Sequence, residues 1–312
     1  MNTKTAFLFP GQGSQSVGMT SAMAEAYPVV RQTFEEASGV LGYDLWDVVE
    51  NGPADTLGRT EVTQPALLAA GIATWRAWKA LEGADPDFVA GHSLGEYTAL
   101  VAAEALAFRD AVSLVAQRGR LMQQATPAGT GAMAAILGLE DAALAEVCEQ
   151  AAQGQVVSCA NFNSPGQVVI AGEREAVDRA CELAKAAGAR RAVPLAVSVP
   201  SHCLLMKPAA DAMAEVLRDT EIRTPSIPVL HNVNASTAGD DQAIREALAQ
   251  QLWQPVRWSE TIQRLVEGGA ERFAECGPGK VLAGLNRRIC RDCETAAWVD
   301  PTALRNSLEN WS

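Results

Sequence analysis

A short serine motif is the part of this sequence best suited to do chemistry. Residues 91–95 read Gly-His-Ser-Leu-Gly and lie between an extended apolar run at 87–90 and a helical run at 94–107. A serine flanked by two glycines at a strand-to-helix turn is typical of a nucleophile elbow, because a bulky side chain would clash in the strained turn. The N-terminus of the following helix favours negative charge. The motif therefore predicts that Ser93 is an exposed nucleophile.

A serine hydroxyl needs a base within hydrogen-bond reach, and the chain has 3 histidines. His202 ends the polar loop at 198–202, directly before a predicted helix. His231 follows a strand-like run, where a buried structural histidine is the plainer interpretation. His92 is next to Ser93 in the turn, and its side chain should point elsewhere. Because loops carry catalytic groups more often than strands do, the residue types favour His202, with His231 second.

Arg118 is the second residue with chemical potential. It lies three residues after Val115 and four before Met122, on the apolar face of a predicted helix at 109–124. A buried guanidinium needs an anionic partner, since an unpaired buried charge is costly. Two partners fit: a glutamate of this chain in a structural ion pair, or a substrate carboxylate bound by the forked guanidinium. The residue pattern leaves both open.

The composition is that of a globular protein. The chain has 312 residues, of which 48% are hydrophobic and 20% charged, enough for one large domain or two modest ones. Its formal net charge of −12 argues against a nucleic-acid partner, and an acidic partner has to dock on a local basic patch. No apolar run is long enough for a transmembrane helix, and the one near the N-terminus is too short for a signal peptide. We expect a cytoplasmic protein without a membrane partner.

The cysteines and the first glycine-rich loop do not indicate a cofactor. The 7 cysteines are scattered, which favours a reducing compartment over a disulfide-stapled scaffold. Cys290 and Cys293 form a lone C-x-x-C, which we expect to be two ordinary thiols, and no metal site is expected. The loop at 11–15 lacks both the third glycine of a dinucleotide motif and the Gly-Lys pair of a P-loop, which excludes nucleotide binding there.

Alternating helical and strand patterns predict an α/β fold. The segments 1–128 and 198–312 predict one catalytic subdomain with a mostly parallel sheet covered by helices, in which Pro65 begins the helix 65–81. Between them, the segment 129–197 has the order β-α-β-β-α-β, typical of a ferredoxin-like unit, and is interpreted as an inserted subdomain. The strands are expected at 6–9, 87–90, 132–137, 156–161, 167–171, 190–197, 228–232 and 272–275. The other helices are expected at 19–38, 94–107, 109–124, 140–153, 173–187, 204–217, 241–251 and 259–267.

Several motifs together resemble those of the malonyl-CoA:acyl-carrier-protein transacylase family. They cover essentially the whole chain in order: Phe-Pro-Gly-Gln-Gly-Ser-Gln at 9–15, Gly-His-Ser-Leu-Gly-Glu at 91–96, Gln-Arg-Gly at 117–119, Asn-Phe-Asn-Ser-Pro-Gly-Gln at 161–167, Val-Pro-Ser-His at 199–202 and Gly-Pro-Gly-Lys at 277–280. Each motif alone is short, but the set is highly specific. The resemblance implies an α/β-hydrolase-like core with a ferredoxin-like insertion.

The resemblance also implies a role for each site residue. Ser93 is the implied acyl-accepting nucleophile and His202 its base. The main-chain carbonyl of Gln251 is implied to orient His202 in place of the carboxylate of a triad. The main-chain N–H groups of Gln12 and Leu94 are the implied oxyanion hole. Such fixed donors stabilise the charge that develops in a tetrahedral intermediate.

For Arg118 the resemblance implies binding of the free carboxylate of a malonyl group. The implied substrate is malonyl-CoA, a coenzyme A thioester, with no permanently bound cofactor. The implied acceptor is the phosphopantetheine thiol of an acyl carrier protein, as in fatty-acid synthesis. Such a carrier is acidic, so a basic docking surface is expected on this acidic chain. Its candidate residues are Arg190, Arg191, Lys280, Arg287, Arg288 and Arg291.

Other functions use the same elbow. A serine esterase or thioesterase is the main alternative, although a hydrolase does not need an arginine on a buried helix face and usually has an acid between the serine and the histidine. A non-enzymatic interaction module is a second alternative. Within the family, an acyltransferase of a polyketide cluster with broader tolerance for extender units remains open, because Val-Pro-Ser-His differs from the His-Ala-Phe-His of malonyl-selective polyketide synthase domains.

Overall fold

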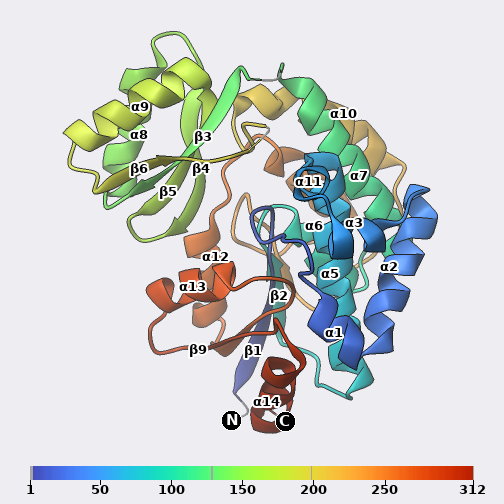
Figure 1. Ribbon diagram of the computed structural model, residues 1–312. Helices are drawn as coiled ribbons and strands as arrows, with labels where there is room; N and C mark the ends of the chain where they lie inside the picture. The colour runs from blue at the N-terminus through green and yellow to red at the C-terminus, as the bar shows by residue number, and fades with distance from the viewer. Residues whose placement is uncertain (1–2, 128, 198, 312) are drawn as a thin grey trace.

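The computed structural model describes residues 3–127, 129–197 and 199–311. Figure 1 shows two groups of strands, each with its own helices. The expected subdomain boundaries at 128/129 and 197/198 involve residues 128 and 198, which lie outside the described residues. Every helix in the described part of the chain is too short or too polar to span a lipid bilayer.

The first sheet has five strands, all parallel, in the order β7-β2-β1-β8-β9. Its central strand β1 is apolar on both faces. Ala6 and Leu8 pack toward the cluster of α12 and α13, whereas Phe7 and Phe9 pack toward the cluster that includes α2, α5, α6 and α7. A parallel sheet buried on both faces needs such a continuous apolar run. The strands are β1 (Lys4–Phe9), β2 (Phe88–Gly91), β7 (Val229–Leu230), β8 (Ala270–Glu275) and β9 (Glu294–Ala297).

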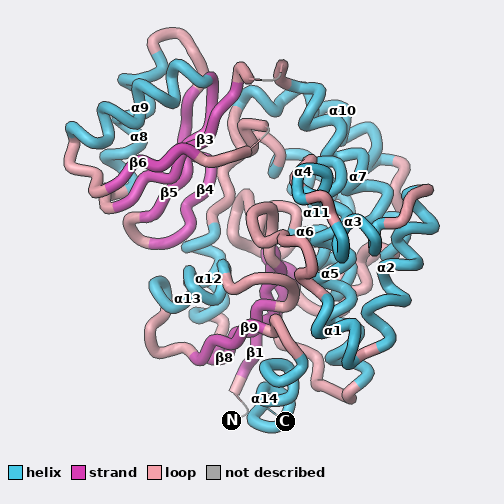
Figure 2. The backbone as a smooth tube through the Cα atoms, in the orientation of Figure 1, coloured by secondary structure: helices cyan, strands magenta, loops and turns pink. Residues whose placement is uncertain are grey.

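Helices surround this sheet (Figure 2). They are α1 (Ser21–Ala26), α2 (Pro28–Leu41), α3 (Leu45–Asn51), α4 (Ala54–Leu57), α5 (Thr60–Ala80), α6 (Gly95–Ala102), α7 (Phe108–Ala125), the 3₁₀ turn η1 (Leu204–Met206), α10 (Lys207–Arg218), α11 (Asp241–Gln251), α12 (Trp258–Glu267), α13 (Val281–Ile289) and α14 (Pro301–Trp311).

The second sheet is antiparallel, in the order β4-β5-β3-β6. One face, with Ala134 and Ile136, packs under α8 and α9, while the other, with Met133 and Val169, packs against Cys203. The second face therefore covers the loop that carries His202. The elements are β3 (Gly131–Leu137), α8 (Asp141–Ala152), β4 (Val157–Ser164), β5 (Gln167–Glu173), α9 (Arg174–Ala186) and β6 (Arg191–Pro194).

The structure corrects several expected elements. Pro65 lies inside α5 and does not begin it, because the first turn from Thr60 is buried against α7, where Gly119 touches Glu61. The expected helix 19–38 is two helices, since the second begins at Pro28. The expected strand 190–197 is confined to β6, and the elements α3, α4, α13, β9 and α14 are additional.

Candidate active site

The serine motif forms a tight turn between β2 and α6. Ser93 has a left-handed backbone with φ +53°. A Cβ on Gly91 would lie 1.8 Å from the main chain of Gly95, and one on Gly95 would lie 2.0 Å from the carbonyl oxygen of Phe9. Both glycines are therefore required by close backbone contacts, as the sequence predicted, and the turn presents the hydroxyl of Ser93 at the end of the strand.

His202 is the histidine that meets this hydroxyl. Its Nε2 lies 2.8 Å from Ser93 Oγ, and its Nδ1 lies 2.7 Å from the main-chain oxygen of Gln251. A carbonyl oxygen only accepts, so Nδ1 carries the proton and Nε2 offers a lone pair to the serine hydroxyl. The main-chain N–H of His202 also donates to the oxygen of Leu252 at 3.0 Å. The end of α11 thus holds both the ring and the backbone of His202.

The surroundings of His202 keep its ring neutral. Burial, and next the charge of Arg118, lower the pKa of His202 from 6.5 to about 3. A neutral imidazole with a free lone pair can accept the proton of an attacking hydroxyl at ordinary pH. The arrangement is therefore chemically competent for serine-based acyl transfer.

The guanidinium of Arg118 lies beside the same hydroxyl. Arg118 is 1% exposed, and it donates to Gln64 Oε1 at 2.9 Å, to Gln251 Oε1 at 2.8 Å and to Ser93 Oγ at 3.3 Å. These partners are amide and hydroxyl oxygens, not carboxylates. Within the described residues its Nε–H has no acceptor. Of the two partners that the sequence left open, a glutamate in a direct ion pair is therefore not found among the described residues.

The two main-chain N–H groups predicted for an oxyanion hole belong to adjoining loops. His92 N–H donates to the oxygen of Phe9 at 3.0 Å, and a Cβ on Gly11 would lie 2.4 Å from the oxygen of His92. The loop after β1 is thus packed directly on the elbow. Among the hydrogen bonds found within the described part of the chain, none is donated by the main-chain N–H of Gln12 or Leu94. Both remain available to a ligand.

The other two histidines face away from the serine. His92 Nε2 lies 2.8 Å from Asn163 Oδ1, and its ring packs on Trp258 with centroids 5.4 Å apart. His231 is 1% exposed, and its Nδ1 lies 2.7 Å from Glu96 Oε1. His231 has the structural surroundings that its strand-like sequence suggested.

Sequence reasoning missed the polar groups behind the elbow. Asn232 accepts from the N–H of Ser93 at 2.7 Å and donates to the oxygen of Gly91 at 2.7 Å, so its side chain fastens the turn. Glu96, buried in the first turn of α6, accepts from Gln251 Nε2 at 2.8 Å. The motif at 91–96 contained Glu96, but only the fold brings Asn232 and Gln251 to it.

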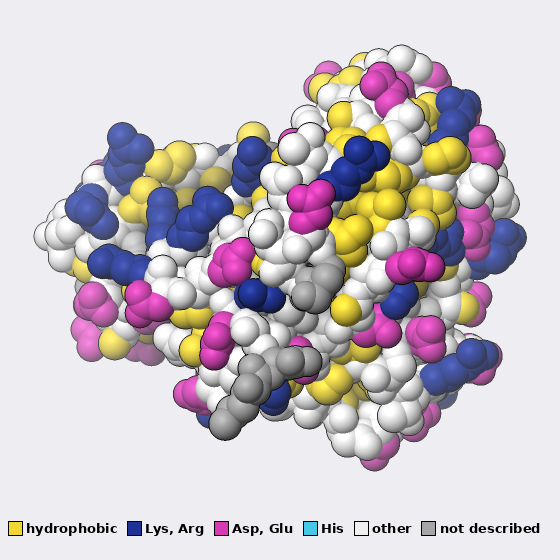
Figure 3. Space-filling model, turned by 90° about the horizontal axis from the view of Figure 1, so that it is seen from below, with side chains coloured by type: hydrophobic (Ala, Val, Ile, Leu, Met, Phe, Trp, Pro, Cys, Tyr) yellow, Lys and Arg dark blue, Asp and Glu magenta, His cyan; other side chains and the backbone are white. Residues whose placement is uncertain are grey.

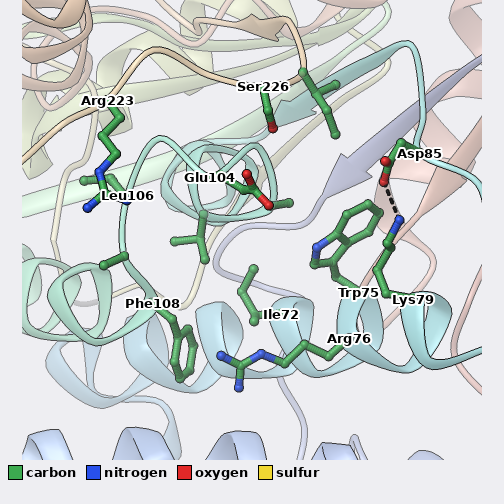
Figure 4. A pocket seen from close by; sticks show the side chains of 14 residues that line it. Ile72, Trp75, Arg76, Lys79, Asp85, Glu104, Leu106, Phe108, Arg223 and Ser226 are labelled. Carbon is green, nitrogen blue, oxygen red and sulfur yellow. Dashed lines mark hydrogen bonds and ion pairs between the residues drawn. The ribbon is translucent and has the colours of Figure 1, made fainter.

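Two cavities lie outside this cluster. One, of about 480 Å³, is lined by none of the predicted site residues, and it contains the ion pair of Lys79 and Asp85 (Figure 4). The other, of about 630 Å³, is the arginine cleft, which is lined by Leu137, Pro165, Gly166, Arg190, Arg191, Arg287, Arg288 and Arg291. Lys280 is exposed but is not part of that lining. Figure 3 shows Lys and Arg side chains gathered on one part of the surface.

The arginine cleft carries little compensating charge. Within the described residues, none of its five arginines is in an ion pair with a carboxylate. Arg287 donates to the oxygen of Thr295 at 3.2 Å, and Arg288 donates to Gln167 Oε1. The cleft joins arginines that precede or begin β6 to arginines at the end of α13 and just beyond it. It is therefore a site of concentrated positive charge on an acidic protein.

The expectation of two ordinary thiols at Cys290 and Cys293 is wrong. The turn after α13 brings their Cα atoms to 5.5 Å, and the structure joins them in a disulfide. The five remaining cysteines are free. Among the described residues, no cluster of His, Cys, Asp and Glu could hold a metal ion.

Comparison with known proteins agrees with the resemblance. A family model described as an acyl transferase domain matches residues 6–306. A malonyl CoA-acyl carrier protein transacylase of Escherichia coli is 54% identical over 98% of this chain and 99% of its own length. One of Bacillus subtilis is 46% identical over 98% and 97%.

Solved structures agree in both sequence and fold. An acyl carrier protein S-malonyltransferase from Vibrio cholerae is 56% identical with a TM-score of 0.95, covering 97% of this chain and 99% of its own. A malonyl-transacylase solved in complex with its type II PKS acyl-carrier protein is 55% identical with a TM-score of 0.98, covering 99% and 100%. Matches of this extent and identity decide the family: the chain belongs to the acyl transferases.

Proposed function

We propose that the protein transfers the malonyl group of malonyl-CoA to the phosphopantetheine thiol of an acyl carrier protein, through a malonyl ester on Ser93. The observation that carries this proposal is one hydroxyl oxygen, Ser93 Oγ, which lies 2.8 Å from His202 Nε2 and 3.3 Å from Arg118 Nη2. A base and a guanidinium that can bind a carboxylate therefore both contact the same nucleophile. The relatives named as malonyl transacylases support the same reaction.

In the first half-reaction, Ser93 Oγ attacks the thioester carbonyl while His202 Nε2 takes its proton. The carbonyl oxygen becomes an oxyanion, which the N–H groups of Gln12 and Leu94 stabilise, by about 3 kcal/mol for each donor. The tetrahedral intermediate then breaks its carbon–sulfur bond. His202 returns the proton to the departing sulfur of coenzyme A, and the malonyl ester of Ser93 remains.

The second half-reaction runs the same chemistry in reverse with another thiol. The pantetheine sulfur of the carrier protein loses its proton to His202 and attacks the malonyl ester. When the carbon–oxygen bond breaks, Ser93 recovers the proton and malonyl-carrier leaves. Because coenzyme A departs before the carrier reacts, the kinetics are ping-pong.

Arg118 gives the site its preference for malonyl. Its Nε–H is buried and has no acceptor among the described residues, so a substrate carboxylate there gains a strong charge-assisted hydrogen bond. An acetyl group leaves that donor unsatisfied and is therefore a poorer substrate than malonyl.

The carrier protein docks at the arginine cleft. Its acidic surface meets Arg190 and Arg191 on one side and Arg287 and Arg288 on the other, while Lys280 contributes from outside the cleft. Unpaired surface charges steer an oppositely charged partner to its site. A related malonyl-transacylase has been solved with an acyl-carrier protein, which supports a protein partner here.

We also propose a division of the chain into two subdomains. Residues 1–128 and 198–312 form an α/β-hydrolase-like catalytic subdomain, which the parallel sheet and the serine turn support. Residues 129–197 form a ferredoxin-like insertion, supported by the strand order β4-β5-β3-β6. The enzyme works in the cytoplasm without a permanent cofactor, where coenzyme A thioesters and carrier proteins supply its substrates.

Mass spectrometry of the intact protein after mixing with malonyl-CoA tests the proposal. We expect the wild-type chain to gain one malonyl group, peptide mapping to place it on Ser93, and addition of a carrier protein to remove it. Ser93→Ala should show no adduct and no transfer. Continuous release of coenzyme A without any carrier would instead indicate a thioesterase, and transfer by the Ser93→Ala variant at the wild-type rate would refute the proposal.

A further inference from the structure

Glu96 is a buried carboxylate for which the proposed reaction has no direct use. It lies three residues after Ser93, in the first turn of α6, and is 0% exposed. Its Oε1 accepts from His231 Nδ1 at 2.7 Å, and its Oε2 accepts from the N–H of Asn232 at 3.0 Å and from Gln251 Nε2 at 2.8 Å. Three donors converge on one carboxylate, which stabilises its charge despite burial.

The bond to Gln251 links this carboxylate to the reacting groups. The amide of Gln251 donates from Nε2 to the carboxylate of Glu96 and to the main-chain oxygen of Ser93. Its Oε1 accepts from Arg118. If the Gln251 amide were flipped, its N–H groups would face the N–H groups of Arg118 and its oxygen would face the carboxylate of Glu96. These donor–donor and acceptor–acceptor contacts are unfavourable, so the orientation of the amide is fixed. The main-chain oxygen of the same residue orients His202.

Glu96 is also the carboxylate that hydrogen bonds join to Arg118. Within the described residues, the guanidinium donates only to amide and hydroxyl oxygens, and the path from Arg118 through Gln251 leads to Glu96. A buried cation without a direct anion is costly, and a fixed negative charge one side chain away reduces that cost.

We propose that Glu96 is a positioning residue that orients Gln251, and through it His202 and Arg118, and whose fixed charge weakens the grip of Arg118 on the malonyl carboxylate. The inference rests on the proposed function. A shuttle that accepts an acyl group from one thiol and gives it to another has to release it again. An anion behind Arg118 keeps the malonyl-enzyme from becoming too stable to react further.

The substitution Glu96→Gln isolates the charge. The carboxylate fixes the proton of His231 on Nδ1, and His231 Nε2 has no partner within the described residues. The proton can therefore move to Nε2, so that Nδ1 accepts from the new amide while the amide oxygen still accepts from Asn232 and Gln251. The side-chain shape and the three hydrogen bonds are retained and the negative charge is lost, at the cost of one buried N–H on His231 Nε2 that has no partner among the described residues.

The test measures formation of acyl-Ser93 and complete transfer to the carrier, each with malonyl-CoA and with acetyl-CoA as donor. For Glu96→Gln we expect the KM for malonyl-CoA to fall by about threefold or more, and kcat for transfer to fall by about tenfold. The KM for acetyl-CoA, which has no carboxylate, should not change. Glu96→Asp keeps the negative charge but places it farther from Arg118, because the side chain is one methylene shorter. The KM for malonyl-CoA should therefore also fall in Glu96→Asp, by less than in Glu96→Gln.

A merely structural role would damage the site for both donors. A KM for malonyl-CoA that stays constant or rises in Glu96→Gln, or equal shifts for both donors, would overturn the inference; if that variant does not fold, Glu96→Asp decides by the same comparison. Glu275→Gln is the matched control. Glu275 is equally buried, but it lies at the end of β8, where it accepts from the main-chain N–H of Ala283. Failure of the wild-type protein to form malonyl-Ser93 would instead refute the proposed function.

Discussion

The site at Ser93 and the arginine cleft both use guanidinium groups, yet they are built in opposite ways. Arg118 is 1% exposed, and each side chain that accepts a hydrogen bond from it makes a further hydrogen bond of its own. The arginines of the cleft are exposed and lack carboxylate partners within the described residues. The comparison separates two tasks, since a buried fork can recognise one small carboxylate, whereas open charges can attract a whole protein surface.

The physical difference between the two regions is the dielectric environment. Charges in a buried site interact strongly and are hardly screened, so geometry decides which ligand fits. Exposed charges are screened by salt, and each contributes little alone. We therefore expect the loss of a buried group that contacts the acyl donor to slow a step by orders of magnitude, and substitutions in the cleft only to weaken an encounter.

The largest effect is expected for His202. Substitution by alanine removes the acceptor of the serine proton, and the rate of malonyl-Ser93 formation should fall by about 10²- to 10⁴-fold. The measurement is rapid-quench mass spectrometry with malonyl-CoA. A decrease of less than tenfold would show that the short contact between His202 and Ser93 is not the path of the proton.

The same histidine predicts an unusual pH profile. Neutral His202 is the active form, and because its pKa is lowered to about 3, that form persists far below the ordinary pKa of 6.5. The rate of Ser93 acylation should therefore vary by less than about twofold between roughly pH 5.5 and 8. An acid limb centred near the ordinary histidine pKa would mean that the ring is more accessible to water than its burial indicates.

Arg118→Ala should have the next largest effect, and it acts on selectivity. Removing the guanidinium eliminates the binding of the malonyl carboxylate, so malonyl transfer should fall by at least about a hundredfold, while acetyl transfer persists or rises. The ratio of kcat/KM for the two donors measures the change. Arg109→Ala, an exposed arginine of the same helix, is the control and should leave the ratio unchanged. An unaltered malonyl preference in Arg118→Ala would remove Arg118 from the acyl site.

The sequence predicted the parts of the site that depend on local geometry. The glycines around Ser93 fix a turn within five residues, and the apolar spacing around Arg118 correctly placed it on a buried face. The strands expected at 6–9 and 87–90 are confirmed as β1 and β2. In these cases the physical cause lies within one or two turns of chain.

What the sequence could not supply depends on contacts between distant segments. Asn232 fastens the turn of Ser93 across 139 residues, and Gln251 reaches Glu96 across 155. No local sequence pattern predicts hydrogen bonds between residues so far apart in the chain. Pro65 was misplaced for a related reason, because packing of α5 on α7 outweighs the preference of proline for a helix start. The pairing of Cys290 with Cys293 likewise required the turn that follows α13.

The smallest effect is expected in the cleft. The double substitution Arg287→Glu and Arg288→Glu reverses two charges, so the KM for an acidic carrier protein should rise by about tenfold at low salt, through a slower encounter. Acylation of Ser93 by malonyl-CoA should not change, because those arginines lie outside the catalytic cluster. Raising the ionic strength from about 50 to 300 mM should narrow the difference between variant and wild type. Arg31→Glu with Arg218→Glu makes the same charge change at exposed ion pairs elsewhere. If that control weakens carrier binding equally, the effect comes from net charge and the cleft has no special role.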